Sequence, residues 1–141
     1  QPYSNNTAIV DAVASGEIYV GLVNHYYLYR FLAEQGDSFA ARNYFFPAGG
    51  AGAMINIAGV GVVDTARNVD AALRFAEYLV SPEAQRYFAE ETNEYPLSGD
   101  SIPLPTDLPA LTAVQAPALD LSDLDDLQGT LQLLQEVGAL D

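Results

Sequence analysis

Hydrophobic residues recur at the three- and four-residue spacing of an amphipathic helix in five stretches of the chain. The first stretch follows Asn6, which can cap a helix, and it ends at Ser15-Gly16. The second runs from Asn24, again a residue that favours the N-cap, to Gly36, which lies just past the expected helix end. The first part of the chain therefore contains two predicted helices.

Three more predicted helices lie in the second half of the chain. Asn68 can cap the third, and the Ser81-Pro82 pair gives the fourth both a cap and a proline in its first turn. We expect Tyr87 and Phe88 of the fourth helix to pack inward. The fifth covers residues 122–137, and its acidic first turn complements the helix dipole.

Two runs have the composition of β-strands. Residues 18–23 and 55–63 are nearly continuous in apolar and β-rich character, a pattern typical of strands that are covered on both faces in α/β folds. A glycine-rich loop, residues 49–52, leads into the second run. So few strands cannot form a sheet that these helices would flank on both faces. We therefore expect the chain to be a piece of a larger protein, or to complete its sheet with another copy of itself.

The charge balance argues against several classes of partner. Five basic residues stand against 19 acidic ones, which gives a formal net charge of −14 at pH 7. Such a chain repels phosphate backbones and anionic lipid heads, so we expect no nucleic acid and no membrane surface as a partner. The chain has no cysteine, which excludes disulfides, thiolate metal sites and cysteine nucleophiles. No apolar run reaches the ~20 residues of a membrane span, and any export signal or lipid anchor is expected upstream of Gln1.

The candidate chemistry lies at the start of the second predicted helix. Tyr26 and Tyr27 place two phenols about 100° apart around the helix axis, so both can converge on one point above the helix end. Phenolate oxygen is a strong ligand for a hard trivalent cation, and a bound cation can remove the phenol proton well below its usual pKa. Two phenolates neutralise only part of the charge of a ferric ion. An additional anion is therefore expected, and a helix N-terminus with asparagine donors nearby can hold one.

Other interpretations of these residues stay open at this point. In an arbitrary sequence, two adjacent tyrosines more often have a structural role, with their rings buried and their hydroxyl groups in contact with water. His25, the only histidine, could be a further ligand, although its position on the helix favours a structural or solvent role. Tyr29 and Arg30 could line the same cleft, although such residues more often pack along the side of a helix.

Four segments of the chain resemble segments of a known family: residues 6–27, 52–62, 72–85 and 92–96. The most specific part is the run Asn24-His25-Tyr26-Tyr27. These segments resemble the bacterial ferric-ion-binding proteins, the receptors of ABC iron importers. The resemblance implies the α/β fold of type II periplasmic binding proteins, in which two lobes close on the ligand by a hinge motion. It also implies that Tyr26 and Tyr27 are the ferric ligands of the C-terminal lobe. Asn24 and Asn6 match the residues that hold the synergistic anion, phosphate or carbonate.

The resemblance further implies a division of the chain. Residues 1–50 are expected to belong to the C-terminal lobe, and residues 51–65 to hold the glycine-rich loop and a strand that crosses back. Residues 66–95 are expected to form helices that pack on an N-terminal lobe absent from this chain. Residues 96–141 form a Pro-rich connection and the C-terminal helix. The fragment alone would leave apolar helix faces open, which predicts self-association or strand exchange.

The function implied by the resemblance is a periplasmic or extracellular solute-binding component. It would capture Fe³⁺ with an anion and deliver it to the permease of an ABC transporter, with further ferric ligands from the N-terminal lobe. An alternative is the same fold with another solute, a phosphonate, thiamine or a polyamine, which the tyrosine pair argues against. A hydrolase that uses an acidic residue with His25 has no recognisable acid and base spacing or nucleophile motif here. We therefore expect a binding protein and not an enzyme.

Overall fold

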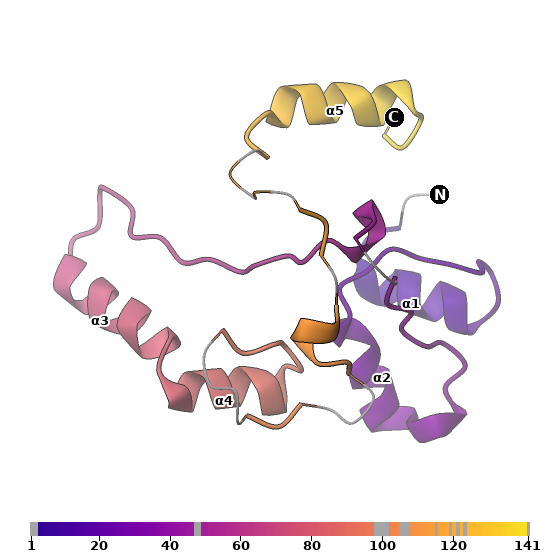
Figure 1. Cartoon of the computed structure of the whole chain (residues 1–141), viewed down its shortest axis with the longest axis horizontal. Helices are drawn as coiled ribbons and strands as arrows, with labels where there is room; N and C mark the ends of the chain where they lie inside the picture. Colours follow the sequence, from indigo (N-terminus) through magenta and orange to yellow (C-terminus); the bar gives the residue numbers. More distant parts are fainter. Residues whose placement is uncertain are drawn as a thin grey trace.

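The computed structural model describes residues 3–46, 49–97, 102–104, 108–114, 116–118, 120, 122 and 124–140. The five predicted helices are confirmed: α1 (Asn6–Ala14), α2 (Tyr26–Gln35), α3 (Val69–Leu79), α4 (Pro82–Glu91) and α5 (Leu127–Glu136). Within the described residues, short 3-10 turns accompany them: η1 (Gly36–Ser38), η2 (Ala51–Ala53) and η3 (Leu111–Ala113). Figure 1 shows α1 and α2 on one side, α3 and α4 on the other, a long run of chain between them, and α5 standing apart.

The main hydrophobic core lies between α1 and α2. Val10 of α1 and Leu28 of α2 are buried there, together with Phe39 and Ala41 from the segment after η1. Phe31 stacks on Phe39, with the two ring centroids 4.7 Å apart. This packing holds the first turns of α2 against α1, and the tyrosine pair lies in those turns.

A glycine lets the chain between these two helices cross α1 closely. A methyl group on Gly21 would overlap the side chain of Ile9 and would lie 3.5 Å from the side chain of Val13. Only a residue without a β-carbon fits such an approach without displacing α1. The run 18–23 can therefore lie directly on the apolar face of α1.

Two helices begin at other residues than predicted. Asn5, and not Asn6, caps α1, because the Asn5 side chain accepts a hydrogen bond from an amide of the first turn at 2.9 Å. α5 begins at Leu127, and Asp126 caps it in the same way at 2.8 Å. The acidic residues therefore precede α5, and the prediction that they form its first turn within residues 122–137 is wrong.

The start of α2 also differs from the prediction. His25, and not Asn24, holds the N-cap position, and its side chain makes no capping hydrogen bond. The Asn24 side chain is engaged with the Tyr26 hydroxyl instead, at 3.2 Å. At the other end the prediction is confirmed: Gly36 ends α2 with a φ of +63°, a backbone conformation that favours glycine.

The second helix pair, α3 and α4, starts as predicted but packs differently. Ser81 caps α4 by accepting a hydrogen bond from an amide of its first turn at 3.3 Å. Asn68 holds the N-cap position of α3 without a side-chain capping bond. Tyr87 is 59% exposed, so the prediction that it packs inward is wrong, whereas Phe88 is half-buried. Small and polar residues form the buried face of α4 instead: Ala84, Gln85 and Ala89.

Neither predicted strand is paired within the described part of the chain. Residues 18–23 and 55–63 have no regular structure, and Figure 1 draws the second run as a long thread that leads to α3. Leu22 is 80% exposed and Val60 is 58% exposed. A strand needs a neighbour for its N–H and C=O groups, and the described residues supply none. The strand prediction is therefore wrong for this chain taken alone.

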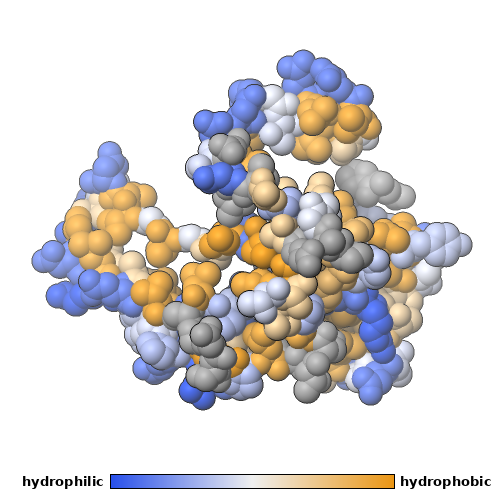
Figure 2. All heavy atoms as spheres, in the orientation of Figure 1, coloured by the Kyte–Doolittle hydropathy of each residue, from blue (hydrophilic) through white to orange (hydrophobic). Residues whose placement is uncertain are grey.

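Apolar side chains remain open to water in several places. None of the residues of α3 is buried, and Leu73 and Phe75 are each at least half exposed. Figure 2 shows apolar atoms gathered on α3 and on the side of α5 that is turned toward the rest of the chain. Over the residues that the structure describes, no helix has both the length and the apolar character to cross a bilayer. Such open apolar faces are the basis of the predicted self-association, which stays a prediction.

Candidate metal and anion site

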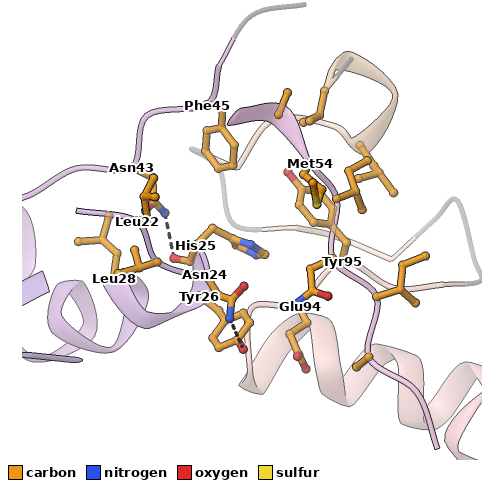
Figure 3. Close-up of a pocket in the computed structure, with 18 of the residues that line it drawn as sticks. Leu22, Asn24, His25, Tyr26, Leu28, Asn43, Phe45, Met54, Glu94 and Tyr95 are labelled. Carbon is orange, nitrogen blue, oxygen red and sulfur yellow. Dashed lines mark hydrogen bonds between the residues drawn. The ribbon is translucent and has the colours of Figure 1, made fainter. Parts of the chain in front are cut away.

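The two tyrosines lie side by side in the first turn of α2. The ring centroids of Tyr26 and Tyr27 are 4.8 Å apart, and the ring planes are tilted by 34°. Both side chains are partly exposed, so neither is sealed in the core. The Asn24 amide donates a hydrogen bond to the Tyr26 hydroxyl at 3.2 Å, as Figure 3 shows. The structure therefore brings three of the four predicted site residues together at one end of α2.

The electrostatics at Tyr26 favour the protonated phenol in the absence of a cation. Burial raises the pKa of Tyr26, and the charge of Tyr27 and a hydrogen bond with it add in the same direction. The Glu94 carboxylate raises this pKa further, and only the hydrogen bond from Asn24 lowers it. A trivalent cation bound to the oxygens would reverse this balance, because it stabilises the charged phenolate.

The tyrosine pair stands between two hollows. Tyr26 borders a cavity of about 750 Å³, whose walls come from both predicted strand runs and from the turn after α4. Tyr27 borders a smaller hollow of about 100 Å³, together with Thr7 and Arg30. Tyr26 therefore borders the large cavity, and Tyr27 borders the hollow beside the start of α1.

Asn6, the fourth predicted site residue, is the first residue of α1 and is half-buried. Its neighbour Thr7 borders the hollow beside Tyr27, so the start of α1 lies next to the pair. Among the hydrogen bonds of the described residues, none joins Asn6 to Tyr26 or to Tyr27. The geometry thus places Asn6 near the site, and no hydrogen bond among the described residues joins it to the phenols.

His25 points to the turn that follows α4. Its Nε2 atom lies 2.7 Å from the carbonyl oxygen of Asn93. Burial lowers the pKa of His25, against smaller opposing contributions from the hydrogen bond to Asn93 and from Glu94. The imidazole is therefore neutral at neutral pH, with Nε2–H as the donor to Asn93. This arrangement agrees with the structural role that the sequence favours for His25.

Several neighbours of His25 are not singled out by sequence reasoning. The Asn43 amide donates to the His25 carbonyl oxygen at 2.9 Å, and the rings of Phe45 and Tyr95 pack around the imidazole. Tyr95 donates its hydroxyl to the carbonyl oxygen of Pro109 at 2.5 Å, and burial raises the pKa of Tyr95 to about 12. In the sequence, Tyr95 stands out only as a member of the run 92–96 that carries the resemblance. No local spacing relates that run to His25.

The arrangement of the helices matches a solved structure. The crystal structure of iron-bound HitA from Pseudomonas aeruginosa superposes with a TM-score of 0.84 at 27% sequence identity, over 96% of this chain and 44% of that chain. This chain therefore has the fold of one part of a type II periplasmic binding protein. The predicted fold class is confirmed, although the sheet of that fold is not formed within the described residues.

Residues 1–119 match the model of the family described as bacterial extracellular solute-binding protein, and the chain belongs to that family. Iron uptake protein A2 of Synechocystis sp. is 38% identical, over 98% of this chain and 42% of its own length. The major ferric iron-binding protein of Neisseria meningitidis is 30% identical, over 98% of this chain and 42% of its own length. The resemblance found in the sequence is confirmed. The chain spans about two fifths of the length of these relatives.

Proposed function

We propose that this chain is the C-terminal part of a solute-binding component of an ABC importer, which captures ferric iron with an anion and delivers it to the membrane permease. The relatives named as an iron uptake protein and as a ferric iron-binding protein support this proposal, as does the iron-bound HitA structure. The observation that carries it is the tyrosine pair. Two partly exposed phenols lie together in the first turn of α2, and one of them, Tyr26, borders a large cavity.

In this function Tyr26 and Tyr27 bind the ferric ion as phenolates. Each phenol gives up one proton on binding, so the affinity for iron rises with pH. Asn24 already touches the Tyr26 hydroxyl, and its amide is a donor for an anion, phosphate or carbonate, that shares the metal. Asn6 would contribute a second amide from the start of α1.

The rest of the protein would supply an N-terminal lobe with the remaining ferric ligands. The open apolar runs 18–23 and 55–63 and the unburied α3 are the surfaces that this lobe and its strands would cover. Residues 1–50 would then belong to the C-terminal lobe, residues 51–65 to the crossing segment and residues 66–95 to the helices that pack on the other lobe. The protein would act outside the cytoplasm, in the periplasm or the extracellular space.

The test uses the full two-lobed protein, incubated with a ferric salt in the presence of phosphate or carbonate. We expect a visible phenolate-to-iron charge-transfer band, which Tyr26→Phe and Tyr27→Phe each weaken and the double variant abolishes. Tyr87→Phe is the matched control, because Tyr87 is an exposed tyrosine on α4 that borders neither of the two hollows.

A colourless protein that holds no ferric ion would overturn the proposal, and so would a double variant that holds it as tightly as the wild type. Binding of a phosphonate, thiamine or a polyamine that survives the double substitution would assign the fold to that other solute instead.

A further inference from the structure

The two helix pairs are joined close to the tyrosine site. α1 contacts α2 and α3 contacts α4, and among the described helices none contacts a helix of the other pair. The turn that follows α4, residues 92–95, reaches the first turn of α2 instead, and Figure 3 shows Glu94 and Tyr95 beside His25 and Tyr26. The contacts that hold this turn against α2 therefore join the two helix pairs at the proposed ferric site.

His25 makes the connection with its side chain. Its Nε2 atom lies 2.7 Å from the carbonyl oxygen of Asn93, a residue 68 positions away in the sequence. The imidazole also packs on Tyr95, with ring centroids 5.2 Å apart, and meets the ring of Tyr26 edge-on at 5.5 Å. One side chain thus touches a proposed ferric ligand on one side and the turn after α4 on the other.

Hydrogen bonds and backbone conformation in the turn fix the direction of the Asn93 carbonyl group. Asn93 has a φ of +58°, in the left-handed region that asparagine tolerates better than most residues. The Thr92 hydroxyl lies 2.7 Å from the carbonyl oxygen of Phe88 and 2.8 Å from the carboxylate of Glu94. The Glu94 amide donates to the same Phe88 carbonyl at 3.1 Å. These bonds anchor both sides of Asn93 to the end of α4, so the direction of its carbonyl group is fixed.

The α2 side of the connection is held as well. The Asn43 amide donates to the backbone carbonyl of His25 at 2.9 Å, which fixes the residue that carries the imidazole. His25 holds the N-cap position of α2, yet its side chain makes no capping bond there. A residue at this position would ordinarily stabilise its own helix through its side chain. Here the His25 side chain instead contacts the turn after α4 and so joins the two helix pairs.

We propose that His25 is a positioning residue for the ferric site: by binding the Asn93 carbonyl, it ties the first turn of α2 to the turn after α4 and so directs the phenol of Tyr26 toward the metal. This inference rests on the proposed function. It assigns His25 no bond to iron. The expected consequence is that loss of the hydrogen bond loosens the first turn of α2, alters the geometry of the phenolate ligands and speeds the release of iron.

The experiment compares His25→Phe and His25→Gln in the full two-lobed protein loaded with ferric ion and phosphate. Phenylalanine keeps a ring but has no donor, whereas glutamine offers an amide N–H at a similar reach. We expect His25→Phe to shift the charge-transfer band and to release iron to an excess of chelator about three- to tenfold faster, in line with the loss of one hydrogen bond. His25→Gln should restore most of the wild-type band and release rate.

Thr92→Val tests the same connection from its other end and leaves every residue of α2 in place. It should shift the band and speed release in the same direction as His25→Phe. Wild-type behaviour of both His25→Phe and Thr92→Val would overturn the inference while the proposed function stands. Equal impairment of His25→Phe and His25→Gln, with Thr92→Val unaffected, would overturn it too. A wild-type protein without a ferric band would overturn the proposed function and this inference together.

Discussion

Leu22 provides a quantitative test of whether the run 18–23 becomes a covered strand in the complete protein. Leu22 is 80% exposed in this chain, whereas Leu28 is only 2% exposed in the core between α1 and α2. A change from leucine to alanine removes three carbon atoms, worth ~0.8 kcal/mol each when fully buried. This chain covers only about a fifth of Leu22, so its own contacts account for roughly 0.5 kcal/mol there. At Leu28 the transfer contribution and the residual cavity give about 3 kcal/mol.

We expect Leu22→Ala to cost about 3 kcal/mol in the full two-lobed protein, as much as Leu28→Ala, because neighbouring strands would bury the side chain. Urea unfolding of the iron-free protein, followed by circular dichroism, measures the free energy of unfolding of both variants. With a slope of roughly 3 kcal/mol per molar urea, each variant should lower the midpoint by about 1 M. A Leu22→Ala midpoint within ~0.2 M of the wild type, beside a full effect of Leu28→Ala, would refute the covered strand.

Two further predictions concern the second helix pair and its surroundings. Ser81→Ala should destabilise α4 by ~1 kcal/mol because it removes a capping hydrogen bond. Asn68→Ala should destabilise α3 by only a few tenths of a kcal/mol, since Asn68 makes no such bond. Amide hydrogen exchange in α3 and α4 measures both effects, and equal destabilisation would contradict the assignment of the caps. The raised pKa of Tyr95 means that the folded state holds this proton more tightly than the unfolded state, whose value is near 10.0. The resulting stability is present below pH 10 and is lost as the pH rises toward 12. Tyr95→Phe should remove the contribution of Tyr95 to this loss of stability in unfolding measurements, and an unchanged profile would contradict the prediction.

The helices could be predicted from the sequence because their signals are local. Apolar spacing marks each helix face, and Gly36 and Ser81 act within one turn of the helix that they end or begin. The errors at helix starts have equally local causes. Asn5 and Asn6 are both competent caps, so composition alone could not choose between them. Asn24 has the side chain of a cap, but the Tyr26 hydroxyl takes its amide.

The rest of the structure depends on contacts that the sequence does not display. The adjacent tyrosines indicated the candidate site because both fall in the first turn of one predicted helix, where their phenols can converge above the helix end. The hydrogen bond between His25 and Asn93 joins residues 68 positions apart, and neither spacing nor composition predicts it. The runs 18–23 and 55–63 have strand composition, yet a strand forms only with a partner, and the described chain offers none. For these elements the decisive partners lie far away in the sequence or outside the chain.

The unpaired run between η2 and α3 also bears on the order in which the polypeptide folds. α1 contacts α2 and α3 contacts α4, and the helices of each pair follow one another in the sequence, so each pair closes at a small entropic cost and forms early. The run itself needs strand neighbours from elsewhere in the proposed two-lobed protein. Its sheet is therefore expected to close last, and its valines and isoleucines stay in contact with water through the early part of folding. During that interval the nascent protein depends most on dilution or on chaperones to avoid aggregation.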